Sequence, residues 1–317
     1  MKRKYILIIS FLLLQVTYSQ NSIEVTCKKK NNNTVQFFYK KNVPGSYYLT
    51  IDFTKLENSN DYQIFKRVIK NKSGYLFTLK PINEKKGISF SYRIKYSFGN
   101  PKPKINNNTT YLLPFKRNKN VKIIEASNLG EKYFGSEKPI DWKSFIIFSK
   151  EPDTVYSMRK GKVVRLIKKY DMDVKFNKSY TSKRNIVLIE HEDGTFATYK
   201  GFNKNQIFVK LGQDVYPHTP LGKLEKFNKN NYRLDFNIFH YLPNLIDKEK
   251  STLKNRISKI KYINPNFFVD NENKKIKSGR FYIVSFNEEI KLKEFSRKEK
   301  RNIRRILMIL NKTLPKT

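Results

Sequence analysis

The chain has 317 residues, which is enough for two domains of ordinary size with hydrophobic cores of their own. Aromatic residues, mostly Tyr and Phe, make up 14% of the sequence, a composition that favours strand-rich domains over helical bundles. The formal net charge of +38 predicts attraction to anionic surfaces such as nucleic acid, anionic lipid or acidic wall polymers, although lysines that only solvate the surface would give the same charge.

Residues 1–19 have the layout of a secretory signal peptide. Residues 2–4 are basic, and a short apolar run follows from Ile6 to Leu14. The small residues Thr17 and Ser19 then precede a cleavage site. The apolar run is shorter than the ~20 residues that span a bilayer, which favours a cleaved signal over an uncleaved anchor. We therefore expect an exported protein of the periplasm or cell envelope, or one released outside the cell.

Residues 20–108 predict an all-β module. Alternating runs such as Thr34–Tyr39, Ser46–Phe53 and Ile88–Ile94 are separated by turn residues, a spacing typical of a small β-sandwich. The only cysteine, Cys27, lies here and excludes an intrachain disulfide. Nothing in the module has catalytic spacing, so we expect a binding or spacer role. The Pro- and Asn-rich stretch Gly99–Asn108 predicts a linker.

Residues 109–245 predict a second, antiparallel β domain whose turns are set by glycines. Glu192-Asp193-Gly194 lies between two apolar runs, and this is a hairpin signature because a tight turn needs positive φ at Gly194. Gly161 and Gly212 mark further turns between short strands.

Four segments of this second domain resemble, in order, the lysostaphin/LytM-type zinc metalloendopeptidases that cut peptide cross-bridges in bacterial peptidoglycan. They are residues 111–115, 154–164, 185–199 and 209–222. The resemblance implies the duplicated hybrid motif fold of that family, and with it a peptidase-like domain spanning residues 109–245. The fold class predicted for the whole chain is therefore mainly β, with a β-sandwich-like module followed by a LytM-like antiparallel domain.

The zinc ligands of that family are missing from the matching positions. A catalytic zinc site needs three protein ligands and an open position for water. The resemblance places Pro139 and Ile146 at the early His and Asp positions, Gly201 at a further His, and Arg233 and Asp235 at the two histidines of His-x-His. The three histidines of the chain have no metal-binding spacing. We therefore expect no catalytic residue, no bound zinc and no other cofactor.

Arg233 and Asp235 are the predicted centre of a binding groove. They lie two residues apart on a predicted strand, so both side chains leave the same face, whereas Leu234 points to the core. The resemblance implies that this face lines the substrate groove, where fixed donors could bind a carboxylate-bearing peptide; a surface ion pair without a ligand is the alternative. His191 and Tyr199, on the matching hairpin, complete the predicted binding set.

Residues 246–317 predict a basic extension with a strand near 280–286 and a helix near 297–311. Ser296 and Glu299 form a capping box at the start of that helix. Four apolar residues then share one face, and basic residues cover much of the remainder. Such a helix either packs on its own domain or lies on an anionic membrane or partner. The four apolar residues are Ile303, Ile306, Leu307 and Leu310.

These patterns favour an exported, catalytically inactive peptidase-like protein that binds peptidoglycan or an envelope hydrolase. One alternative is an active, divergent zinc metalloendopeptidase that cleaves peptidoglycan cross-bridges. A second alternative is a basic protein that binds anionic lipid, wall polymer or another polyanion through its charge. Nucleic acid is not an expected partner of an exported protein.

Overall fold

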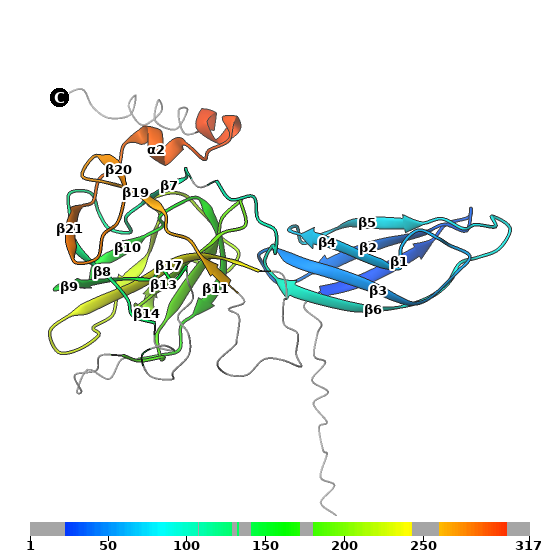
Figure 1. The fold of residues 1–317 in the computed structure, drawn as a ribbon, viewed down its shortest axis with the longest axis horizontal. Coiled ribbons are helices and arrows are strands. Elements are labelled where there is room, and N and C mark those ends of the chain that lie inside the picture. Colours follow the sequence, from blue (N-terminus) through cyan, green and yellow to red (C-terminus); the bar gives the residue numbers. More distant parts are fainter. Residues whose placement is uncertain are drawn as a thin grey trace, which may run out of the picture.

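The structure is a computed structural model that describes residues 23–106, 108–128, 132, 141–171, 180–242 and 260–302. It is mainly β, with antiparallel sheets and short helical segments in the described residues, which confirms the predicted fold class. Figure 1 shows an elongated N-terminal module that meets a second β domain at one end. No helix in the described part of the chain is long and apolar enough to cross a membrane.

The N-terminal module, fully described over residues 23–106, is built from two three-stranded antiparallel sheets. Their inner faces carry a dense group of aromatic rings, and Phe37 stacks on Phe77 with ring centroids 4.6 Å apart. The alternation of buried and exposed residues expected for a half-buried strand is clear in β2. One sheet contains β1 (Ile23–Lys29), β2 (Val35–Lys41) and β5 (Ser73–Leu79), and the other β4 (Ile64–Ile69), β3 (Tyr47–Glu57) and β6 (Ser89–Phe98).

The largest sheet among the described residues has nine strands and forms the centre of the second domain. Its long central strand pairs with neighbours on both sides and holds the residues predicted for the groove. In spatial order the strands are β15 (Asp214–Val215), β11 (Gly161–Ile167), β12 (Ile186–Glu190), β13 (Phe196–Lys200), β17 (Tyr232–Tyr241), β9 (Phe145–Ser149), β8 (Asn120–Glu125) and β21 (Arg280–Ile283), and β18 (Ile260–Tyr262) pairs with β17.

Strand β17 has one apolar face, and its other face is polar from Arg233 to Asn237 and aromatic at Phe239 and Tyr241. Leu234, Phe236 and Ile238 are at most 1% exposed and belong to the main hydrophobic core, as the alternation predicts. Arg233 and Asp235 leave the opposite face. The predicted hairpin is also confirmed, because β12 and β13 pair in antiparallel register around a turn in which Gly194 has a φ of +87°.

Two smaller sheets complete the second domain. In one of them β19 lies parallel to β7, so residues predicted for the C-terminal extension pair with the first strand after the linker. The extension also contributes β21 to the large sheet through β8. The first small sheet contains β10 (Thr154–Tyr156), β16 (Pro220–Leu224) and β14 (Phe202–Ile207), and the second β20 (Glu272–Lys275), β19 (Asn266–Val269) and β7 (Thr110–Leu112).

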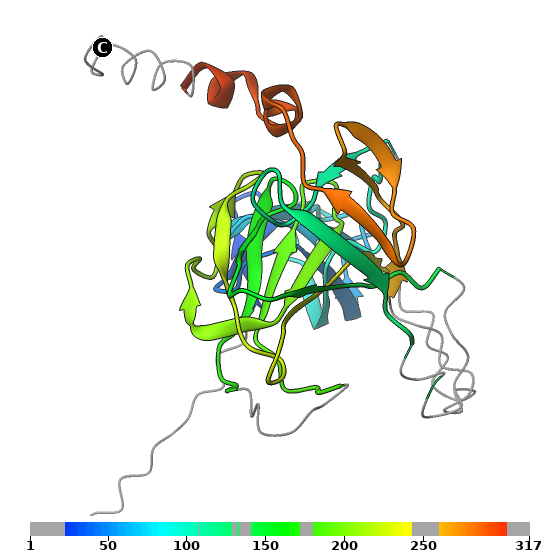
Figure 2. The same cartoon turned by 90° about the vertical axis from the view of Figure 1, so that its left-hand side faces the viewer.

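The C-terminal segment begins with the short helix α2 (Glu288–Leu292), which lies beside β7 and β19 at the edge of the domain (Figures 1 and 2). A second helical stretch runs over residues 297–302. Its predicted capping box is confirmed: Ser296 N donates to Glu299 Oε2 at 2.7 Å, and Glu299 N donates to Ser296 Oγ at 3.3 Å. The predicted apolar face beyond residue 302 lies outside the described residues.

Glu299 also holds the start of this helix against the second domain. Its carboxylate accepts from Lys160 Nζ at 2.8 Å and from the Tyr216 hydroxyl at 3.0 Å. Phe295 stacks on the Tyr216 ring with centroids 4.6 Å apart. The hydrogen bond from Lys160, followed by those from Ser296 and Tyr216, lowers the pKa of Glu299 to about 2. The capping residue is therefore also a docking residue.

We expect this docking to weaken in acid. Because the pKa of Glu299 is lower in the folded protein than its ordinary value of 4.5, its contribution is present above that value and is lost as the pH falls toward about 2. Amide hydrogen exchange of residues 295–302 should accelerate over this range, after correction for the intrinsic pH dependence. In Glu299→Gln the exchange should be fast throughout, whereas Glu288→Gln, which changes a carboxylate that is 75% exposed, should behave as the unchanged protein does. An acid response that survives in Glu299→Gln would contradict the assignment.

The N-terminal module docks on the polar face of the large sheet. Ser46 donates from its backbone N to Glu190 Oε2 at 2.7 Å, and its hydroxyl donates to the other oxygen of the same carboxylate. Phe98 packs on Phe196 and Tyr241 with ring centroids 5.3 and 5.5 Å apart. Burial raises the pKa of Glu190, and the two bonds from Ser46 act in the opposite direction. The contact between the modules is therefore a buried one.

Candidate functional site

The candidate site lies where three strands meet on the polar face of the large sheet. Asp235 of β17 is directly opposite Lys200 of β13 on one side and Ile146 of β9 on the other. Directly opposed residues of antiparallel strands share a face, so these side chains form one row. The structure thus brings Ile146 and Asp235 together.

Arg184, which precedes β12, completes the centre of the site. Its Nη1 donates to Asp235 Oδ2 at 2.8 Å, and its Nη2 donates to the backbone oxygen of Arg233 at 2.6 Å. Arg233 approaches the other carboxylate oxygen, with Nε donating to Asp235 Oδ1 at 3.0 Å. Two guanidinium groups therefore share one carboxylate. We call Arg184, Arg233 and Asp235 the Asp235 cluster.

Phe227 covers the Asp235 cluster. Its ring centroid lies 5.0 Å from Arg184 Cζ and 4.6 Å from Arg233 Cζ, which places both cations within cation–π distance. The ring is 2% exposed, and the side chains of Arg184 and Asp235 are 6% and 16% exposed. The cluster is thus largely removed from water, where charge pairs interact more strongly than at the surface.

The pKa values of Arg184 and Lys200 reflect their burial and the charges around Asp235. Burial lowers the pKa of Arg184, and Asp235 acts in the opposite direction while Arg233 adds to the lowering. Burial also lowers the pKa of Lys200, again opposed by Asp235, and Arg184 adds to the lowering. Asp235 is therefore the common counter-charge of these basic side chains.

Gly201 lies against the Asp235 cluster in a conformation suited to glycine. Its φ is +123°, and a Cβ added to it would lie 2.1 Å from Arg184 Nη2 and 2.2 Å from the backbone oxygen of Arg233. The resemblance implies a histidine at this position. In this chain the Arg184 guanidinium fills the space that any side chain at position 201 would need.

The residues of the site do not fit the zinc ion that the resemblance implies. Both oxygens of Asp235 accept hydrogen bonds from guanidinium groups, and a divalent cation at the carboxylate would be repelled by these fixed positive charges. Ile146 and Gly201 offer no donor atom from their side chains. In the described part of the chain, no three His, Cys, Asp or Glu side chains form a group that could hold a metal ion. We derive no metal-dependent step.

The remaining predicted binding residues, Tyr199 and His191, are buried and face the hydrophobic core. Tyr199 is fully buried on the core face, and its hydroxyl accepts from the backbone N of Met158 at 2.8 Å. His191 is 1% exposed, and its Nδ1 lies 2.7 Å from the Lys160 backbone oxygen. Burial lowers the pKa of His191 to about 4. Neither side chain is close to the Asp235 cluster, and Pro139 lies outside the described residues.

A row of aromatic and basic side chains extends from the buried Arg233 across β9, β8 and β21, and its two rings are exposed. Phe148 is directly opposite Arg233, and Lys122 is opposite Phe281. The register of β8 against β9, continued by one residue, places Lys122 beside Phe148. Phe281 and Phe148 are 64% and 42% exposed. We call Phe281, Lys122, Phe148 and Arg233 the aromatic row.

Sequence reasoning did not identify Arg184, Lys200 or Phe227 as parts of the site. Arg184 is 51 positions from Asp235 in the chain, and nothing in its immediate sequence distinguishes it from a surface arginine. The only signal that could have found it is its place directly before the segment 185–199. The predicted pair of Arg233 and Asp235 is therefore incomplete, because Arg184 also bonds to the Asp235 carboxylate.

Comparisons with known proteins yield distant structural similarity. No protein-family profile and no curated protein matches the chain. A candidate peptidase M23 from Pseudomonas aeruginosa is similar at 14% identity over 63% of this chain and 90% of that one, with a TM-score of 0.28. Csd3 of Helicobacter pylori is 11% identical over 92% of this chain and 84% of its own, with a TM-score of 0.27. A zinc-containing peptidase of Vibrio cholerae is 13% identical over 71% of this chain and 84% of its own, with a TM-score of 0.23.

Proposed function

We propose that this chain is an exported, catalytically inactive peptidase-like protein that acts by binding in the cell envelope. Its targets are peptidoglycan or a hydrolase that acts on it. The observation that carries the proposal is the Asp235 cluster, in which two guanidinium groups occupy both oxygens of the one carboxylate at the centre of the site.

The chemistry of the Asp235 cluster supports inactivity. A general base must be free to accept a proton from water or substrate, and both oxygens of Asp235 are already engaged by permanently charged donors. A Lewis-acid mechanism needs a ligand set that Ile146, Gly201 and the two arginines do not provide. Fixed positive charge from two arginines thus occupies the centre of the site.

The aromatic row supports a binding role. Large exposed rings next to cations form the kind of surface patch that soluble proteins use to bind partners. Lys122 can donate charge-assisted hydrogen bonds to carboxylates, and the rings of Phe148 and Phe281 offer apolar area beside it. Peptidoglycan combines carboxylate-bearing peptides with apolar methyl groups. This pattern fits such a ligand better than a uniform polyanion.

Export is supported by the basic segment, apolar run and small residues at positions 1–19. The net charge of +38 favours the anionic cell envelope as the place of action. Binding through net charge alone, to anionic lipid or wall polymer, is the second candidate function, favoured by that charge. The two modes differ in salt dependence, because purely electrostatic binding to a linear polyanion weakens linearly in log salt.

We expect the purified protein to co-sediment with purified peptidoglycan at physiological ionic strength. Replacing both exposed rings, Phe148→Ala with Phe281→Ala, should reduce the retained fraction several-fold, because it removes the apolar part of the aromatic row without leaving a charge buried. Phe208→Ala is the matched control, since its ring is 50% exposed and it follows β14, outside the large sheet. Equal retention of all three proteins, or no retention at all, would contradict wall binding through this surface.

The same preparation tests inactivity directly. We expect sub-stoichiometric zinc by plasma mass spectrometry and no release of soluble fragments from peptidoglycan. One zinc per chain, lost on chelation together with wall-lytic activity, would instead establish a divergent zinc metalloendopeptidase. Retention that falls steeply with salt and ignores the two ring substitutions would favour the polyanion-binding alternative.

A further inference from the structure

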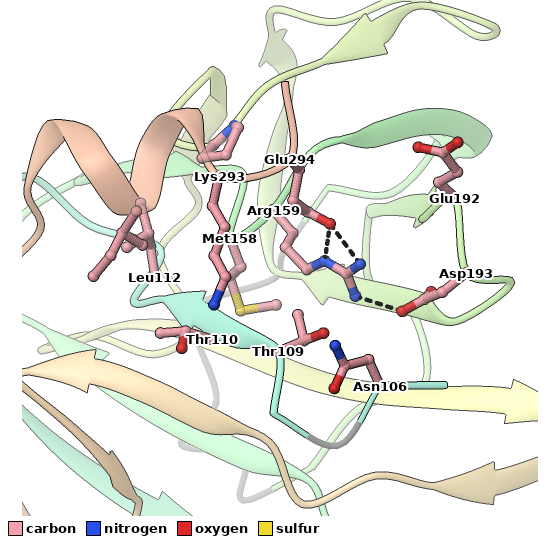
Figure 3. A pocket seen from close by; sticks show the side chains of 12 residues that line it. Asn106, Thr109, Thr110, Leu112, Met158, Arg159, Glu192, Asp193, Lys293 and Glu294 are labelled. Atoms are coloured by element: carbon pink, nitrogen blue, oxygen red, sulfur yellow. Dashed lines mark hydrogen bonds and ion pairs between the residues drawn. The ribbon is translucent and has the colours of Figure 1, made fainter. Parts of the chain in front are cut away.

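A pocket of about 340 Å³ lies at the other end of the second domain, between the linker, the β12–β13 turn and the C-terminal segment (Figure 3). Asn106 and Thr109 line it from the linker, Asp193 from the turn, and Lys293 from the residues after α2. Its size is in the range of natural sites for small ligands. None of the residues of the Asp235 cluster or the aromatic row contributes to it.

One wall of the pocket is a closed ion network around Arg159. The Arg159 side chain is 6% exposed; its Nη1 donates to Asp193 Oδ2 at 2.9 Å and to the Tyr111 hydroxyl at 2.9 Å. Its Nε donates to Glu294 Oε1 at 2.8 Å. These bonds join the linker end, the hairpin turn and the C-terminal segment. The wall is therefore preorganised, and its charges are satisfied within the protein.

Two charged side chains of the lining are not part of that network. Within the described ranges, neither the Lys293 ammonium nor the Glu192 carboxylate forms an ion pair or a side-chain hydrogen bond. Figure 3 shows them on opposite sides of the Arg159 guanidinium, Lys293 beside Leu112 and Met158 and Glu192 in the hairpin turn. The pocket thus offers one available cation and one available anion at separate ends.

The rest of the lining offers hydrogen bonds and apolar contact on the Lys293 side of the pocket. The hydroxyls of Thr109 and Thr110 and the amide of Asn106 face the same space. Leu112 and Met158 provide an apolar surface beside Lys293. A ligand that uses all of these groups carries a carboxylate at one end, an ammonium at the other, and a peptide bond or small apolar side chain between them.

We infer that this pocket binds the free ends of a short peptide, with the terminal carboxylate at Lys293 and the terminal ammonium directed toward Glu192. A nucleotide or other polyanion does not fit, because the lining has a single available cation and three carboxylates. A simple anion would leave Glu192 without a partner.

This pocket is independent of the proposed wall-binding surface. Asp193 precedes β13 and Gly201 follows it, so the length of a five-residue strand separates the two sites, roughly 15 Å at about 3.3 Å per residue. The outcome of a peptide-binding experiment therefore does not depend on whether the aromatic row binds peptidoglycan.

The test is titration calorimetry of the full chain with dialanine, in L and D forms, and with its two blocked derivatives. Saturable binding of dialanine is expected at millimolar or lower concentration. Dialanine amide, which lacks the carboxylate, should bind about threefold more weakly, because Lys293 is exposed to solvent. N-acetyl-dialanine, which lacks the ammonium, should bind about threefold more weakly, because Glu192 is exposed to solvent.

Matched variants locate the binding in the pocket. Lys293→Met should weaken dialanine binding about threefold and abolish the difference between dialanine and its amide. Lys291→Met is the control, because Lys291 lies two residues earlier, in α2, pairs with Glu288 and does not line the pocket. Absence of saturable dialanine binding, or binding that is unchanged in Lys293→Met, would overturn the inference. If the Phe148 and Phe281 variant loses wall binding but still binds dialanine, the inference of peptide binding in the pocket is supported.

Discussion

Replacing Asp235 by Asn should destabilise the protein by about 3 kcal/mol, because it removes the shared counter-charge of two buried guanidinium groups without changing the shape of the side chain. Removing one partner of a buried ion pair typically costs about 3–5 kcal/mol. A loss of stability at the lower end of this range is expected, because Arg184 keeps its bonds to the backbone oxygens of Arg233 and Lys200. Urea unfolding followed by the fluorescence of the single tryptophan, Trp142, measures the change.

Asp214→Asn is the matched control for this substitution. Asp214 also pairs with a basic residue, Lys162, but its side chain is 66% exposed and that of Lys162 is 43% exposed. An exposed pair contributes about 0–1 kcal/mol, so the control should be nearly neutral. Similar losses in the two variants would show that the Asp235 cluster is an ordinary surface ion pair and would remove the main support for the proposed function.

Gly201→Ala should also destabilise the protein strongly, by roughly 3 kcal/mol or more. A non-glycine residue in this conformation costs about 1–3 kcal/mol, and overpacking a closely packed site typically costs a further 1–3 kcal/mol. The added methyl group would meet the backbone oxygen of Arg233, which cannot move away as a flexible side chain could. The same unfolding measurement applies.

Gly279→Ala separates the two costs. Gly279 has a φ of +80° but no heavy atom within 4 Å of an added Cβ, so only the backbone cost of about 1–2 kcal/mol should be seen. A larger loss in Gly201→Ala than in Gly279→Ala would measure how tightly the Arg184 guanidinium and the Arg233 backbone close the site. Equal losses would mean that the site can relax around a side chain at position 201.

The local parts of this structure follow from the sequence. The β12–β13 hairpin depends on a glycine at a turn between two apolar runs, and the capping box depends on two residues three positions apart. The two faces of β17 follow from the period of a strand, which separates Leu234 from Arg233 and Asp235. In each case the signal and the structure involve neighbours in the chain.

The centre of the candidate site could not be predicted in the same way. Arg184 reaches Asp235 only because β12, β13 and β17 lie side by side, and that arrangement depends on pairing between strands far apart in the chain. Phe227 lies in no segment whose sequence shows the periodicity of a strand or helix, yet its ring covers both guanidinium groups. Contacts of this kind depend on tertiary register, which a single sequence does not display.

The docking of the N-terminal module gives the linker a different mechanical role from that of a flexible tether. Because Ser46 and Phe98 hold the module to Glu190, Phe196 and Tyr241, the two halves of the chain should tumble in solution as one elongated body. The long axis of that body is then fixed relative to the face that carries Asp235. A protein of this shape sets a defined distance and direction between whatever its far tip contacts and whatever its second domain holds.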